Sequence, residues 1–324
     1  MNGPYAFHLH LVAWIVIAAI GIAYVVGVRR VSRTSQPGTA PTGRQWWCLA
    51  AGLVTLAVAL TWPVADLAAH WSLTALLVQR LLLILAVAPL LLLAMPAPLL
   101  AALTRPAPVD RALEVLTRPV VAVVVFTVIA VGTLLIPVVA AQTSSGIVRA
   151  VVDAVLLFGG VVLWGPVLRH IPGASRPSAV GLAAYLFVQS VVPGFPSVIY
   201  VFAHHPLYPA FAHAHAAIGL SAVADQQVAG VVAKVATLPV LWTVAYIALT
   251  RAARQDAIGS DTGVLTWAEV ERHLQRAERR EKRGPERRPR RPSPIPRPWN
   301  TPGPDSGATS GPPTSELPGD PPGP

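Results

Sequence analysis

Residues 200–234 read YVFAHHPLYPAFAHAHAAIGLSAVADQQVAGVVAK. This stretch contains a short polar connection between two strongly apolar segments. The connection holds four histidines, and the apolar segment after it begins with one carboxylate and two amides. Polar side chains within or beside apolar membrane-spanning segments are costly to bury in lipid, and they therefore mark functional positions. We expect the activity of the protein on this side of the molecule. The residues concerned are His204, His205, His213, His215, Asp225, Gln226 and Gln227.

The whole chain has the composition of a polytopic membrane protein. Of its 324 residues, 53% are hydrophobic and only 12% are charged, about half the charged share of a soluble domain. The formal net charge of +10 comes mostly from arginines in short connections and in the C-terminal tail. This charge indicates topology and contact with a lipid surface rather than nucleic-acid binding. A single cysteine, Cys48, excludes an internal disulfide and a CxxC motif.

Seven apolar runs are long enough to cross the roughly 30 Å hydrocarbon core of a bilayer as helices. Arginines follow alternate runs, so the positive-inside rule places the N-terminus outside and the C-terminus in the cytoplasm. Arg149, beside an outer connection, is the one arginine that disagrees. Pro193 and Pro196 predict a kink in the sixth run. The expected spans are residues 7–28, 46–64, 73–95, 120–140, 147–168, 179–202 and 226–249.

The expected architecture is therefore an all-α integral membrane protein with three parts. Residues 1–254 form a bundle of seven transmembrane helices. Residues 255–283 form a cytoplasmic amphipathic helix, in which Thr266 and Glu269 are spaced as a capping box. Residues 284–324 are rich in proline and arginine, cannot bury a core and are predicted to be disordered. The basic tail either binds anionic lipid at the cytoplasmic face or is simply solvated.

Most of the histidines fall on the predicted outer side. Neutral imidazole is a good ligand for copper or zinc. An H-x-H pair can offer two nitrogens to one ion in an extended backbone, whereas in a helix its rings point about 200° apart. Histidine also lies at the lipid headgroup level without any ligand, so both interpretations remain open. The outer histidines are His8, His10, His70, His204, His205, His213 and His215.

Four charged residues fall within the outer halves of the predicted spans. Each unpaired charge costs several kcal/mol in lipid, so we expect the two cations to neutralise the two carboxylates. Such a cluster is either a static set of ion pairs that joins three helices or part of a path for protons or ions. Its members are Arg80, Asp153, Asp225 and Lys234.

Four motifs resemble the multi-spanning CtaG family of cytochrome c oxidase assembly factors. They are FHLHLVAW with GVRR in the first span, QRLLL followed by Pro89 in the third, LWGPVL in the fifth and DQQVAG in the last. The resemblance covers about residues 5–250. It implies a multi-pass protein of the bacterial plasma membrane, with oxidase subunits as partners and copper as the candidate ion. The motif positions singled out are Gln79, Gln226, Gln227 and Gly230.

The third span departs from the pattern that the resemblance implies. That family usually carries HMxQHLLL there, and its histidines and methionine fall on Leu76, Leu77 and Arg80 of this chain. The tryptophan of its late Met-Trp pair falls on Lys234. Both new cations stand where the charge of a metal ion would otherwise lie near Asp225. We infer that fixed cations replace a bound one, which would keep the fold and remove a third-span metal site.

These observations predict a non-enzymatic membrane accessory factor linked to copper-site biogenesis of a respiratory oxidase. No nucleophile elbow, phosphate-binding glycine loop, HExxH motif or close carboxylate pair in an apolar setting indicates an enzyme. A transporter for a metal ion or small solute is the alternative, and it would be favoured by a continuous polar path and internal repeats. A purely structural partner of a respiratory complex is a further possibility.

The arginine pattern makes a testable prediction about topology. In intact cells, a membrane-impermeant thiol reagent should label cysteines placed at Ser144 and Ala214 but not one placed at Thr42. Labelling at Thr42 from outside would reverse the topology and move the histidines to the cytoplasmic side.

Overall fold

The structure is a computed structural model that describes residues 10–34, 40–168, 177–212 and 219–263. Apart from Gly263, these residues belong to one compact unit that ends at Thr262. Every regular element in these ranges is a helix, including one π-helical segment, η1. The elements are α1 (Leu11–Thr34), α2 (Gly43–Leu60), α3 (Val64–His70), α4 (Leu73–Leu81), η1 (Leu82–Val87), α5 (Ala88–Ala94), α6 (Ala97–Thr104), α7 (Ala107–Leu116), α8 (Pro119–Gly132), α9 (Ile136–Ser144), α10 (Gly146–Trp164), α11 (Ala179–Val191), α12 (Phe195–Phe202), α13 (Pro209–Ala212) and α15 (Ala222–Gly263).

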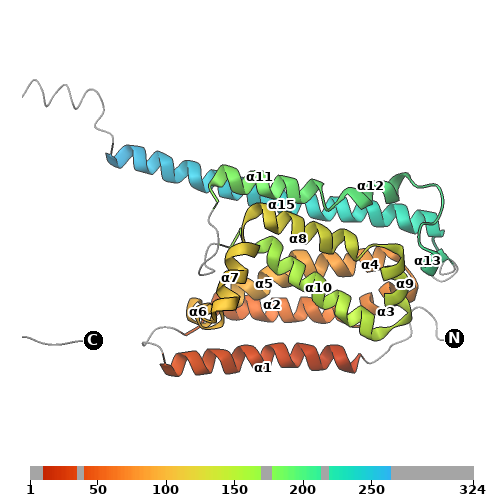
Figure 1. Ribbon diagram of the computed structural model, residues 1–324, viewed down its shortest axis with the longest axis horizontal. Coiled ribbons are helices and arrows are strands. Elements are labelled where there is room, and N and C mark those ends of the chain that lie inside the picture. The colour runs from red at the N-terminus through yellow and green to blue at the C-terminus, as the bar shows by residue number, and fades with distance from the viewer. Residues whose placement is uncertain (1–9, 35–39, 169–176, 213–218, 264–324) are drawn as a thin grey trace, which may run out of the picture. The chain divides into compact units, whose positions relative to one another are not determined.

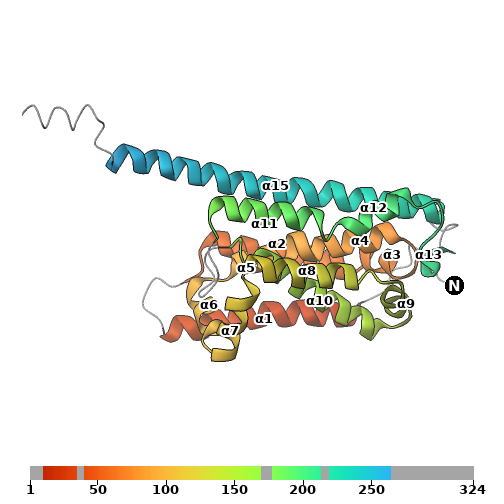
Figure 2. The same ribbon diagram turned by 45° about the horizontal axis from the view of Figure 1, so that its top comes forward.

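The long helices lie side by side, and the short helices gather at the two ends of the bundle (Figures 1 and 2). Helices α3, α9 and α13 lie together at one end, where α9 contacts both of the others. We call this the outer end, because the topology prediction places it outside. Helices α6 and α7 lie at the opposite end, which we call the inner end. The arginine-rich connection after the third span is therefore helical rather than extended.

The described helices are long and apolar enough for several membrane spans. Six qualify individually, and a seventh exists if α7 and α8, which bend by 88° at the break between them, are counted as one span. The six are residues 11–32, 43–70, 73–94, 146–164, 179–202 and 222–254. The all-helical membrane class agrees with the sequence analysis. The count of seven and the orientation in the membrane stay predictions.

The fourth expected span, residues 120–140, is not a continuous helix. It is divided between α8 and α9, and the residues expected to form the following outer connection partly belong to α9. The cause is Pro137, which has no N–H to donate to the carbonyl of Thr133 four residues earlier. Arg80 supplies the missing donor from another helix, with Nη2 2.9 Å from the Thr133 carbonyl oxygen.

A proline also reshapes the third span. The π-helical segment η1 directly precedes Pro89, and in this wider register the carbonyl of Ile84 would need the N–H that Pro89 lacks. The indole Nε1 of Trp164 donates to that carbonyl oxygen at 2.9 Å. One hydrogen bond thus joins the LWGPVL motif to the residue that directly follows QRLLL, 80 residues away in the chain.

The predicted kink in the sixth span is confirmed, because α11 ends at Val191 and α12 begins at Phe195. The last helix is longer than expected, since α15 begins before Gln226 and extends to Gly263. Residues 264–283 of the expected amphipathic helix and the whole expected tail lie outside the described residues.

Helices α12 and α15 approach each other closely at Gly230. A Cβ atom at this position would lie 2.6 Å from the backbone oxygen of Ser197 and 2.8 Å from a methyl group of Val201. The glycine of the DQQVAG motif is therefore required by packing, because any side chain would push the two helices apart.

We predict that Gly230→Ala destabilises the detergent-solubilised protein by about 1–3 kcal/mol, the usual range for overpacking. Thermal unfolding followed by circular dichroism measures the change. Gly132→Ala is the matched control, because a Cβ there meets no atom within 4 Å. Equal unfolding temperatures for the two variants would contradict the close approach.

Candidate functional site

The carboxylate of Asp225 binds the N-terminus of α4 at the outer end. Its oxygens accept hydrogen bonds from the Ser72 hydroxyl at 2.7 Å, the Leu73 N–H at 2.6 Å and the Thr74 N–H at 3.4 Å. The first turn of a helix leaves N–H groups without intrahelical acceptors and carries a partial positive charge. The buried carboxylate is therefore stabilised by a helix end, and it joins α15 to α4.

The two glutamines that follow Asp225 hold the polar connection before α13. The Gln226 side chain accepts from the Leu207 N–H at 2.8 Å and donates to the His205 carbonyl at 3.5 Å. The Gln227 side chain donates to the Ala203 carbonyl at 3.4 Å. The two histidines between these anchors, His204 and His205, are exposed. The DQQ residues thus fix the connection that displays part of the predicted histidine set.

Arg80 is buried, and its described contacts are with neutral groups. Besides the Thr133 carbonyl, its guanidinium donates to the Thr133 hydroxyl at 3.2 Å and to Oε1 of Gln142 at 3.3 Å. No ion pair within 4 Å joins Arg80 to Asp153 or Asp225 in the described part of the chain. The predicted direct pairing of Arg80 with a carboxylate is therefore not seen among the described residues, because a backbone carbonyl left free by proline takes donors of the cation. An electrostatic interaction with Asp153 remains.

Asp153 lies near two arginines without a direct ion pair to either. It interacts electrostatically with Arg149 and, more weakly, with Arg80. Its described hydrogen-bond donor is Nε2 of Gln79, 3.4 Å from both carboxylate oxygens. Gln79, a position that the resemblance singled out, therefore links α4 to α10.

Lys234 forms no ion pair with either carboxylate among the described residues. It lines a cavity between α4, η1, α8, α10, α11, α12 and α15, and neither Asp153 nor Asp225 lines that cavity. The four charged residues predicted as one cluster therefore occupy three different environments. The hypothesis that Arg80 and Lys234 replace a metal ion beside Asp225 loses its basis, since a helix N-terminus already neutralises that carboxylate.

Two hydrogen-bonded tyrosines lie near Arg80 toward the outer end. The hydroxyls of Tyr200 and Tyr208 are 2.6 Å apart, and the Tyr208 hydroxyl donates to the Leu134 carbonyl at 2.7 Å. That carbonyl lies in the break between α8 and α9. Burial raises the pKa of the Tyr208 phenol above its ordinary range, so this donor stays neutral at physiological pH.

The predicted outer histidines are only partly described. His10 Nε2 lies 3.1 Å from a carboxylate oxygen of Asp66 on α3. His70, at the other end of the same short helix, is exposed and interacts electrostatically with Asp66 and Arg149. His8, His213 and His215 lie outside the described residues. Among the residues that the structure describes, no three histidine, cysteine or acidic side chains are arranged to hold a metal ion.

Several functional positions were missed at the sequence level. The sequence analysis gives Asp66 no role, although it is the acidic residue in the outer connection that holds His70. The remaining positions carry no signal of their own, because their role is to bind a backbone carbonyl or a polar side chain that lies far away in the sequence. They are Ser72, Gln142, Trp164, Tyr185 and Tyr208.

The helical architecture, with several apolar spans and polar side chains gathered toward one end, defines a multi-pass integral membrane protein. Residues 22–255 match the family of cytochrome c oxidase caa3 assembly factors (Caa3_CtaG), and the chain belongs to this family. The family expected from the four motifs is thus confirmed. No curated protein and no solved structure matches the chain.

The separation of Arg80 from Asp225 predicts independent energetic effects. Arg80→Leu leaves the Thr133 carbonyl and the Gln142 amide oxygen without their donor, at about 1–3 kcal/mol for each unsatisfied group. Asp225→Asn weakens the cap of α4 by removing its charge. Because the two side chains bind different helix ends, we expect the double variant to be additive within about 0.5 kcal/mol in detergent unfolding. Recovery of stability in the double variant would instead reveal an ion pair.

Proposed function

We propose that this protein is a non-catalytic accessory factor that assists assembly of a respiratory cytochrome c oxidase in the bacterial plasma membrane. We further propose that it handles copper for the oxidase through the histidines of its outer end. The observation that carries the second proposal is the arrangement of His10 against Asp66, with exposed His70, His204 and His205 on neighbouring segments. Membership of the caa3 assembly-factor family supports the first.

The His10–Asp66 pair has the chemistry of a supported metal ligand. A carboxylate that accepts from one ring nitrogen fixes the tautomer of the imidazole and raises the basicity of the other nitrogen. Imidazole nitrogen binds copper well. The exposed histidines add further donors without being enclosed, and an open site of this kind suits transfer of an ion to a partner better than permanent retention.

The anchored connection gives the proposal a structural basis. Asp225, Gln226 and Gln227 bind the start of α4 and the segment from Ala203 to Leu207, so the exposed histidines stand on a supported backbone. A docking partner would then meet a largely preorganised surface, which lowers the entropic cost of association.

Copper binding by the full-length protein in detergent tests this proposal. We expect His10→Ala, and separately the joint change of His204 and His205 to alanine, to lower the affinity for Cu(I) measured by competition with a chromophoric chelator. Asp66→Asn should weaken binding by about 10–100-fold, the usual effect of losing a group that orients a metal-bound histidine. His273→Ala is the control, since the predicted topology places it in the cytoplasm.

An assembly readout separates copper handling from a purely structural role. Each variant is expressed in cells that lack the wild-type protein, and the copper content and activity of the oxidase are measured in isolated membranes. Loss of oxidase copper in the histidine variants, with normal amounts of the protein itself, supports copper handling. Normal oxidase copper in all histidine variants but not in cells without the protein would support a structural partner and reject copper handling.

A further inference from the structure

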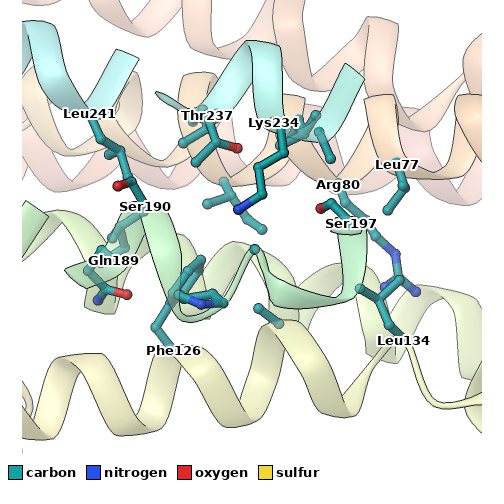
Figure 3. A pocket seen from close by; sticks show the side chains of 18 of the residues that line it. Leu77, Arg80, Phe126, Leu134, Gln189, Ser190, Ser197, Lys234, Thr237 and Leu241 are labelled. Carbon is teal, nitrogen blue, oxygen red and sulfur yellow. The ribbon is translucent and has the colours of Figure 1, made fainter. Parts of the chain in front are cut away.

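A cavity in the middle of the helix bundle has a composition that the assembly role does not explain. It measures about 90 Å³, and nine of its 20 lining residues are leucine, isoleucine or phenylalanine. Figure 3 shows several of the lining side chains. Two cations, Arg80 and Lys234, also line it, and none of its described lining residues is acidic. Asp153 lies close enough to interact electrostatically with Arg80. No described carboxylate forms an ion pair with Lys234, so the charge of this lysine is the unbalanced one.

Lys234 is the cation that remains available. Figure 3 shows its side chain reaching from α15 into the cavity. A Cβ atom built on Gly194 would lie 2.8 Å from its Nζ, so the ammonium lies against the break between α11 and α12. Within the described ranges, Nζ makes no hydrogen bond and no ion pair. Lys234 lies about 18 Å along α15 from Ala222, so polar groups at the outer surface are too far away to bind its ammonium group.

Other polar groups of the cavity are also incomplete. Nε of Arg80 is buried without a hydrogen-bond acceptor in the described residues, although the rest of the guanidinium is bound. Oε1 of Gln189 is buried without a donor. The Gln189 amide cannot simply turn over, because its Nε2 donates to a Tyr185 hydroxyl that itself donates to the Leu163 carbonyl. Buried polar atoms without partners mark a place where water or a ligand completes the structure.

The cavity shares two wall residues with an apolar groove on the surface of the bundle. Leu81 and Leu85 line both spaces, and the groove, about 470 Å³, runs between the third-span helix and α15. Its described lining is entirely apolar, and Val235 on its rim is 65% exposed. The cavity is too small for a whole lipid, whereas the adjoining groove falls in the size range of ligand sites.

We propose that the cavity beside Lys234 binds the carboxylate head of a single-chain amphipathic molecule, a long-chain fatty acid, whose apolar chain lies in the groove between η1 and α15. The carboxylate supplies acceptors to the ammonium of Lys234 and balances its charge. The apolar wall selects against a hydrated inorganic anion, which would need more donors than the cavity provides. The leucine-lined groove accommodates the chain.

Fluorescence titration of the delipidated full-length protein in detergent tests this proposal. The probes are cis-parinaric acid, a fluorescent straight-chain carboxylate, and its uncharged methyl ester. We expect the acid to bind at least about tenfold more tightly than the ester, the effect of one charge-assisted contact. Inorganic phosphate should not displace it. Native mass spectrometry before delipidation should show a fatty acid bound to the wild-type protein.

Variants locate the site. Lys234→Gln should weaken binding of the acid by about tenfold or more while leaving the ester unaffected, and Lys234→Arg should restore tight binding. Arg254→Gln is the matched control, an exposed cation on the same helix outside the cavity. The acid and ester comparison uses wild-type protein and does not depend on the folding of any variant. Equal binding of acid and ester, displacement by phosphate, or unchanged binding in Lys234→Gln would each overturn the proposal.

Discussion

Backbone carbonyls released at proline breaks must find donors inside the bundle, because lipid offers none. This requirement organises the described helices. The Thr133 carbonyl accepts a hydrogen bond from Arg80. The Ile84 carbonyl accepts one from Trp164, and the Leu134 carbonyl accepts one from Tyr208. Each bond joins a broken or widened segment to a side chain from another part of the bundle, on a helix for Arg80 and Trp164 and in the connection before α13 for Tyr208. The prolines therefore create the breaks, and polar side chains packed beside them make those breaks tolerable.

The same requirement explains why charge balance misled the sequence analysis. Two cations and two carboxylates in apolar spans suggest mutual pairing, since unpaired charge is costly in lipid. The carboxylate of Asp225 instead takes the N–H groups of a helix start, and Arg80 serves a carbonyl and two neutral oxygens. Helix ends and helix breaks carry partial charges that are fixed in place. They compete with full charges as partners, and composition does not reveal them.

The outer end combines support with exposure. Asp225 and the two glutamines after it tie α15 to α4 and to the connection before α13, while His204 and His205 in that connection point their side chains to the surface. Close packing of α12 on α15 at Gly230 lies directly behind this region. The DQQVAG motif thus holds the connection in place, and the proposed copper chemistry belongs to the exposed histidines of that connection.

The sequence alone determined the helical membrane class, the family and the kink before Phe195, because apolar run length, motif order and proline are local properties. Pro137 is also a local cause, and it accounts for the break within residues 120–140. The sequence did not determine that Arg80 binds the Thr133 carbonyl at this break, that Asp225 binds the start of α4, or that His10 lies against Asp66. These outcomes depend on which backbone groups and side chains meet across 50 to 150 residues of chain. Only the tertiary structure decides which of these groups come into contact, since each polar group binds the partner that packing brings within hydrogen-bond distance.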